Sequence, residues 1–219
     1  MSWEVDHLVV AARRLDEGIA WCEATFGIVP AAGGAHPLMG THNRVFAIGS
    51  ARHPRCYFEI IAIDPAAPAP GRSRWFDLDD SALQSRLDQG PALVHWVARC
   101  ADVRGACQSL RDLGIDRGEV IEAERDTPEG RLRWQIAVRA DGQRLFAGAL
   151  PTLIQWGEVH PTDSLPASGV SLVSLAVGGL PEGVSGLLPE SVETRPAMAG
   201  SLVATLDTPR GRVTLAATI

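Results

Sequence analysis

The chain has 219 residues, of which 46% are hydrophobic and 21% charged, and its formal net charge is −6 at pH 7. This length allows one large domain or two small ones. The arginines are scattered, which argues against a nucleic-acid partner, and no apolar run reaches the roughly 18–20 residues that cross a bilayer. Because no leader-like segment stands at the N-terminus, we expect a cytoplasmic protein without a membrane partner.

Several residue types and motifs that define enzyme classes are absent. All basic residues are arginine, so Schiff-base chemistry and a P-loop lysine are excluded. Neither GxSxG nor GxGxxG occurs, which excludes a nucleophile elbow and a Rossmann fingerprint. No CxxC spacing is found, and the cysteines are expected to be reduced and mostly buried.

The first third of the chain predicts a β-α-β-β-β unit. A strand is expected at residues 3–12 and a helix at 15–27, where apolar residues recur at helical spacing and Gly27 stands at the C-cap. Residues 30–40 form a predicted loop rich in Gly and Pro. Further strands are predicted at 28–31, 44–48 and 56–63.

The same order of elements begins again after a Pro- and Ala-rich connection. LVHWVARC predicts a strand, DVRGACQSLRDLG a helix, and GEVIEA, RLRWQIAVRA and PTLIQW three more strands. His7 and His95 hold the same place in the two units, so we infer an internal repeat. The expected boundaries are a first module at 1–66, a connecting loop at 67–90, a second module at 91–162 and a β-rich partial module at 163–219.

The tail predicts strands and no complete helix. VSLVSLAVGGL is typical of a strand, PEGVSGLLPES of a short irregular or helical turn, and SLVATLDTPRGRVTLAA of a hairpin around Pro209-Arg210-Gly211. Such a segment either extends a sheet or makes a contact between copies of the chain.

Four polar side chains interrupt the apolar strands at matched places of the repeat: His7, Glu59, His95 and Gln155. Alternation along a strand puts His7 on the face of Val9 and turns Asp6 the other way. If the two units pack with twofold pseudosymmetry, the four side chains converge in one cleft. They then offer a first shell for a divalent metal such as Zn, Fe, Mn or Ni.

Each of these residues also has a simpler interpretation. A histidine in a strand is more often a hydrogen-bonded core residue than a ligand, and Glu59 can pair with an arginine. Because the four residues hold matched positions in the repeat, one shared polar cleft is favoured over a separate structural role for each residue.

Other residues are predicted to line this cleft. His42 is a candidate to move a proton, together with Glu59. The expected substrate-binding residues are Asn43, Tyr57, Arg133 and Trp96, with the protein core as the alternative for the tryptophan.

The segments VDHLVVAARRLDEGIAWCEATFG, GTHNRVFAIG and CYFEIIAIDP resemble a glyoxalase-like domain of the vicinal oxygen chelate superfamily, and RLRWQIAV and LPTLIQWGEVHP are similar to its second half. The resemblance covers roughly residues 3–162. It implies an α+β fold in which paired β-α-β-β-β modules form a cupped, barrel-like mixed sheet. A metal would lie inside the cup, on His7, Glu59, His95 and Gln155, although many metal-dependent members have a carboxylate at the place of Gln155.

Three functions are compatible with these features. The first is a metal-dependent lyase or isomerase that acts on a small molecule with adjacent oxygens. The second is an extradiol-type dioxygenase with Fe(II) on His7, His95 and Glu59. The third is a metal-free module that sequesters a small molecule. A homodimer is the default expectation for the superfamily.

Overall fold

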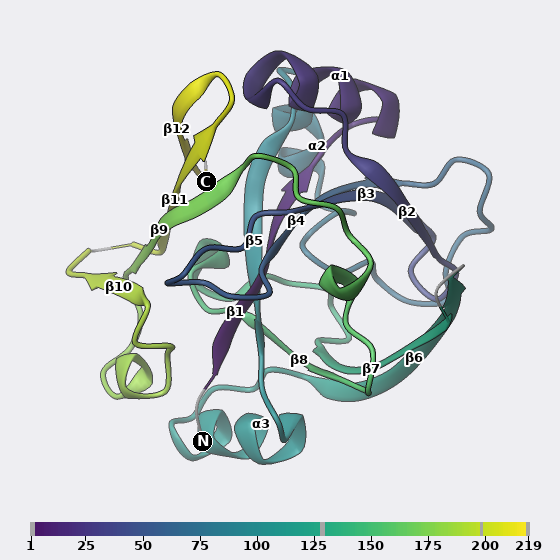
Figure 1. The fold of residues 1–219 in the computed structure, drawn as a ribbon. Helices are drawn as coiled ribbons and strands as arrows, with labels where there is room; N and C mark the ends of the chain where they lie inside the picture. Colours follow the sequence, from purple (N-terminus) through teal and green to yellow (C-terminus); the bar gives the residue numbers. More distant parts are fainter. Residues whose placement is uncertain (1–2, 128–129, 198, 218–219) are drawn as a thin grey trace.

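The computed structural model describes residues 3–127, 130–197 and 199–217. Within these ranges the strands form an eight-stranded sheet and a four-stranded sheet, and α1 and α3 pack against the larger one (Figure 1). Among the described helices, none has both the length and the apolar character that a membrane crossing requires.

The elements follow one another in three groups. The first unit contains β1 (Glu4–Ala11), α1 (Leu15–Phe26), β2 (Ala31–His36), β3 (Thr41–Ala47) and β4 (Tyr57–Ile63). The second contains α2 (Ser81–Leu87), β5 (Ala92–Arg99), α3 (Val103–Asp112), β6 (Glu119–Thr127), β7 (Gly130–Val138), η1 (Leu145–Gly148) and β8 (Thr152–Trp156). The tail contains η2 (Pro161–Asp163), β9 (Ser171–Gly178), η3 (Val184–Gly186), β10 (Val192–Arg195), β11 (Ser201–Thr208) and β12 (Gly211–Ala216).

The large sheet is built from two halves of the same internal order. Its strand order is β2-β3-β4-β1-β5-β8-β7-β6. β1 pairs parallel with β4, β5 pairs parallel with β8, and the antiparallel pair β1–β5 joins the halves. The predicted fold class, paired β-α-β-β-β modules in a cupped mixed sheet with a C-terminal partial module, is therefore confirmed.

Two apolar layers lie on the two faces of this sheet. The layer on the convex face packs Phe58 and Trp96 against α1, α3 and the four-stranded sheet of the tail. The layer inside the cup includes Trp75, Phe76 and Leu78, which come from the segment between the modules. Because that segment fills part of the cup, it shapes the interior and is more than a connection.

The structure differs from the sequence prediction at three elements. The second strand lies at 31–36, not at 28–31, because residues 31–32 and 35–36 of the predicted loop pair with β3, while the two glycines between them lie at a register shift. Helix α2 lies inside the predicted connecting loop and is capped by Asp80, whose side chain accepts the Leu83 N–H. Strand β10 pairs parallel with β9 in a stretch for which no element was predicted.

Helix α1 ends as predicted and packs closely on β4. Gly27 adopts φ 77°, the left-handed conformation that favours glycine at a helix C-terminus. Gly18 is buried in the middle of the helix, and a Cβ there would lie 2.4 Å from Cγ2 of Ile60. Glycine at position 18 therefore lets α1 approach the sheet.

The Gly18→Ala substitution is expected to destabilise the protein despite the higher helix propensity of alanine. Overpacking of a filled core costs about 1–3 kcal/mol, whereas the propensity gain is about 1 kcal/mol. The midpoint of chemical denaturation should fall for Gly18→Ala. Gly71→Ala is the control, because a Cβ at Gly71 meets no atom within 4 Å. An unchanged midpoint for Gly18→Ala would contradict the close packing of α1.

Candidate active site in the cup

A β-bulge in β1 shapes the polar centre of the cup. The register between β1 and β5 shifts between Val5 and His7, so that Asp6 is the extra residue. Asp6 Oδ1 lies 2.6 Å from Nδ1 of His7. The expectation that Asp6 turns away from His7 is therefore wrong, because a bulge re-aims side chains that regular alternation would separate.

Asp6 is completely buried and is held by three donors. Its Oδ2 lies 3.0 Å from Nε2 of His160 and 3.0 Å from Nε1 of Trp156, and its Oδ1 contacts His7. The Thr162 N–H donates to Nδ1 of His160, so the His160 proton lies on Nε2 and points to Asp6. Burial opposes ionisation, but hydrogen bonds from His160 and His7 outweigh it and hold the pKa of Asp6 well below its usual value.

The opposite side of His7 faces Glu59. Nε2 of His7 lies 3.7 Å from Oε2 of Glu59, and both side chains are nearly buried. The other carboxylate oxygen, Oε1, accepts a hydrogen bond of 2.5 Å from Nδ2 of Asn43. Asn43 is itself fixed by the N–H of Gly34, which donates to Oδ1 at 2.8 Å. One Glu59 oxygen is thus anchored, and the other is left beside His7.

Tyr57 covers the imidazole of His7. The two rings stack with centroids 4.4 Å apart and an interplanar angle of 21°. Burial, reinforced by the nearby carboxylates Asp6 and Glu59, raises the pKa of Tyr57 well above its usual value. The phenol therefore stays protonated and keeps an O–H to donate.

These groups line a small cavity inside the cup. Its volume is about 40 Å³, enough for a few water molecules. The walls come from strands of both halves and from the segment between them: His7, His36, Asn43, Val45, Tyr57, Glu59, Trp75, Phe76, Arg125, Trp134, Ile136, Ile154, Trp156 and Pro161. Of the predicted site residues, His7, Glu59, Asn43 and Tyr57 are brought together here.

His95 lies deeper and outside this cavity. Its Nε2 accepts the N–H of Thr152 at 3.0 Å, which occupies the nitrogen lone pair that a metal would need. Burial lowers the pKa of His95 well below its usual value, and the positive charges of Arg117 and Arg144 lower it further. The surroundings of His95 thus disfavour a cation.

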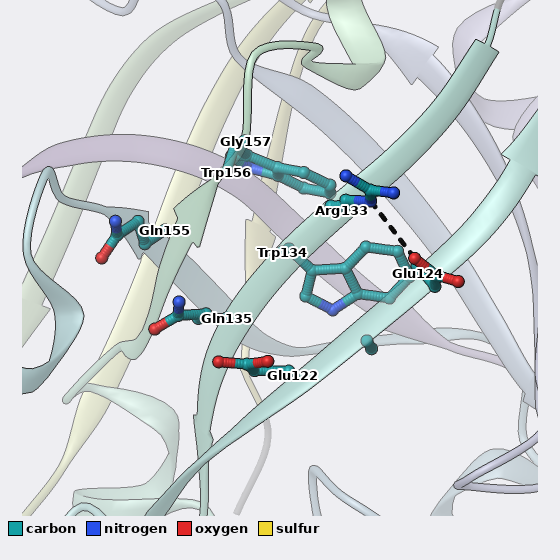
Figure 2. A pocket seen from close by; sticks show the side chains of 9 residues that line it. Glu122, Glu124, Arg133, Trp134, Gln135, Gln155, Trp156 and Gly157 are labelled. Carbon is teal, nitrogen blue, oxygen red and sulfur yellow. Dashed lines mark hydrogen bonds and ion pairs between the residues drawn. The ribbon is translucent and has the colours of Figure 1, made fainter.

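Gln155 lies on the opposite face of the sheet. Its Oε1 accepts the backbone N–H of Val103 at the start of α3. It lines an open pocket of about 470 Å³ beside β6, β7 and β8, together with Arg133, which pairs with Glu124 at 3.2 Å (Figure 2). The predicted convergence of Gln155 with the other three residues is wrong, because the cup-facing positions of β8 are Ile154 and Trp156.

Trp96 and His42 also lie away from the cavity. Trp96 is fully buried in the convex-face layer, where its Nε1 donates to the carbonyl of Ala149. His42 lines a separate surface pocket beside α1, and its Nδ1 lies 3.9 Å from Asp64. The core interpretation of Trp96 therefore holds, and His42 stands apart from the cavity of Glu59.

The donors do not form the predicted metal centre. Among the described residues no group of three His, Cys, Asp or Glu side chains is placed to hold a metal ion. Only His7 and Glu59 face each other, while His95 and Gln155 are engaged by backbone N–H groups. The same geometry removes the basis for an iron centre on His7, His95 and Glu59.

Two residues of the site were missed by the sequence analysis: Asp6 and Arg125. Asp6 next to His7 carried a usable signal, since an acidic residue inside an apolar strand needs partners. The position of Arg125 also carried a signal, because Glu122, Glu124 and Asp126 alternate on the exposed face of β6 and Arg125 lies between them on the other face.

Comparisons with known proteins identify relatives of this fold. A family model described as a glyoxalase-like domain matches residues 5–188. A solved structure of a hypothetical protein from Staphylococcus aureus superposes with a TM-score of 0.58 at 15% identity, covering 90% of this chain and 88% of that chain. No curated protein matches.

Two epimerase structures are also similar. Methylmalonyl-CoA epimerase in complex with methylmalonyl-CoA and NH4+ gives a TM-score of 0.44 at 21% identity, covering 73% of this chain and 99% of that chain. Methylmalonyl-CoA epimerase from Mycobacterium tuberculosis gives a TM-score of 0.38 at 17% identity, covering 74% and 91%.

Replacing Asp6 by Asn is expected to destabilise the fold strongly. The change removes the charge that three donors surround, and breaking a buried charged network costs about 3–5 kcal/mol. The free energy of unfolding should be measured by denaturation at pH 7. Asp207→Asn is the matched control, since it removes an exposed aspartate that pairs with Arg212 and should leave the midpoint nearly unchanged. Equal midpoints for the two variants would contradict the role of Asp6.

Stability is expected to decline as the pH falls from about 6.5 to about 4, in part because of His36. Burial lowers the pKa of His36 from 6.5 to about 4, so the unfolded chain takes up the proton first. The free energy of unfolding therefore drops in this window, by about 2 kcal/mol between pH 7 and pH 5 for one such group. Denaturation curves at the two pH values should show a smaller drop for His36→Gln than for the wild type. An equal drop would show that His36 does not contribute.

Proposed function

Because the chain belongs to the glyoxalase-like domain family, we propose that its cup is the active site of an isomerase or lyase that moves a proton next to a carbonyl group of a small molecule. The observation that carries the proposal is the pair formed by His7 and Glu59, which faces a cavity. Asp6 holds the imidazole of His7 in place, and Asn43 holds the carboxylate of Glu59. Pairs such as His7 and Glu59 are the usual agents of general acid–base catalysis.

Glu59 is the base in this proposal. Asn43 holds Oε1, so Oε2 is the oxygen available to accept a proton from a substrate carbon. The electron pair of the broken C–H bond moves onto the carbonyl oxygen of the substrate. The phenol O–H of Tyr57 is available to donate to that oxygen, and so is Nε2 of His7, which is stacked under Tyr57, when both nitrogens of the ring carry a proton.

Asp6 has a positioning role in this scheme. Its carboxylate accepts from Nδ1 of His7 and so leaves Nε2 toward the cavity. A negative charge on Asp6 also stabilises His7 when it carries a second proton. Return of the proton to the other face of the substrate carbon completes an isomerisation, and loss of a leaving group from the neighbouring carbon completes a lyase reaction.

A metal-free binding module is the second candidate. It is favoured by the aromatic walls of the cavity, which include Trp75, Phe76, Trp134 and Trp156. Aromatic walls bind small molecules without any need for proton transfer. The two functions differ in whether a bound molecule exchanges its C–H protons.

The Glu59→Gln substitution is expected to abolish proton exchange. A panel of 2-oxo acids, 2-hydroxy ketones and β-keto acids is incubated with the protein in D2O, and loss of the C–H signal is followed by proton NMR. The wild type should accelerate exchange in at least one compound. Glu59→Gln should slow it by about 100-fold or more, because general-base catalysis is worth about 10²–10⁴-fold.

Glu182→Gln serves as the control, because Glu182 is exposed and lies outside the cup. Incubation with EDTA should leave the exchange rate unchanged, since His7 and Glu59 are the only predicted metal ligands that line the cavity. Binding of several panel compounds without exchange in any of them would overturn the enzyme proposal and favour the binding module. Loss of exchange in EDTA would overturn the metal-free mechanism.

A further inference from the structure

Arg125 closes the gap between the two outer strands of the large sheet. It lies on β6, and β6 and β2 are the two end strands of the sheet order (Figure 1). Its guanidinium reaches Gly34 on β2. A Cβ on Gly34 would lie only 2.3 Å from Nη1 of Arg125. The glycine in β2 thus leaves room for the guanidinium at the wall of the cavity.

The guanidinium of Arg125 has donors without acceptors. Its Nε and Nη1 atoms are buried, and neither has a hydrogen-bond partner within the described part of the chain. The neighbouring arginines differ, because Arg131 pairs with Asp126 and Glu124, and Arg133 pairs with Glu124. Those two side chains are exposed, whereas Arg125 lines the cavity.

Arg125 is half-buried as a residue, and two of its guanidinium nitrogens are closed off from water without an acceptor. Buried donors without an acceptor are unfavourable, so their presence at the cavity calls for an explanation. Glu59 is the carboxylate that lines this cavity, but it is bound by Asn43 and forms no ion pair with Arg125. The described residues thus supply no counter-charge to the guanidinium of Arg125, and a bound molecule can supply it.

Guanidinium geometry narrows the chemistry of that counter-charge. The N–H groups of arginine lie in one plane and match the two oxygens of a carboxylate. The volume of the cavity is about 40 Å³, so the anionic group that enters it must be small. Asn43, Glu59 and His36 line the same cavity, which places the anion near the base.

We propose that Arg125 forms an anion subsite that binds a carboxylate of the substrate and so presents the neighbouring carbon to Glu59. This inference rests on the proposed function of the cup as a small-molecule site. It makes the substrate a small carboxylic acid with a carbonyl group nearby. Arg125 then acts as the specificity residue, and Glu59 as the base.

Binding of oxalate and of its neutral analogue oxamide tests the subsite without any turnover. The two probes have the same planar shape and differ in charge. By titration calorimetry the wild type should bind oxalate about tenfold or more tightly than oxamide. The Arg125→Met variant should lose this preference. Arg131→Met, which removes an exposed arginine of the same hairpin, should retain it.

A second variant covers the case in which Arg125→Met does not fold. Gly34→Ala keeps the charge but pushes the guanidinium from its place, and it should weaken oxalate binding while leaving oxamide binding unchanged. Equal affinity of the wild type for both probes, or a preference that survives in Arg125→Met, would overturn the subsite. Tighter binding of inorganic phosphate than of oxalate would overturn the carboxylate assignment.

The binding and exchange measurements separate the two proposals. Oxalate selectivity that depends on Arg125, without proton exchange in any compound, would keep the subsite and remove the enzyme. Exchange that depends on Glu59, without oxalate selectivity, would keep the enzyme and remove the subsite.

Discussion

The buried carboxylate of Asp6 is the constraint on which the arrangement of the cup depends. A charge without access to water must be compensated by nearby donors, and Asp6 obtains them from its neighbour His7 and from the distant residues Trp156 and His160. These contacts fix the orientation of His7 and hold the end of β8 and the following turn against β1. One carboxylate thus connects the N-terminal strand to the end of the second module and sets the direction of the imidazole in the cavity.

The repeat made much of the fold predictable. Periodicity identified both long helices and most strands of the two units, and the matched interruptions by His7 and Glu59 pointed correctly to the interior of the cup. Glu59 lies on a strand with regular alternation, and the bulge in β1 comes before His7, so that His7, Leu8 and Val9 alternate regularly. The facing of a strand residue can be predicted there because side chains alternate between the two faces and the apolar face must be buried. A polar residue on the apolar face is then easily recognised in the sequence.

The remaining features depend on contacts that no local pattern encodes. The bulge at Asp6 breaks alternation by one residue, and the face of Gln155 was misjudged because β8 directs Ile154 and Trp156 into the cup. Gln155 instead binds the first turn of α3, a contact between segments about fifty residues apart in sequence. The site is consequently less symmetric than the repeat, with a polar first half and an aromatic second half.

The long separation between Asp6 and its partners has a consequence for synthesis on the ribosome. Trp156 and His160 lie 150 and 154 residues after Asp6, and β1 pairs with β5 across about ninety residues. While the first module emerges, its central strand has one unpaired edge and its carboxylate has no distant donor. An unpaired strand edge invites association with other chains. The central pairing of β1 with β5 and the distant donors of Asp6 therefore become available only after residues 92–99 and 156–160 have been made.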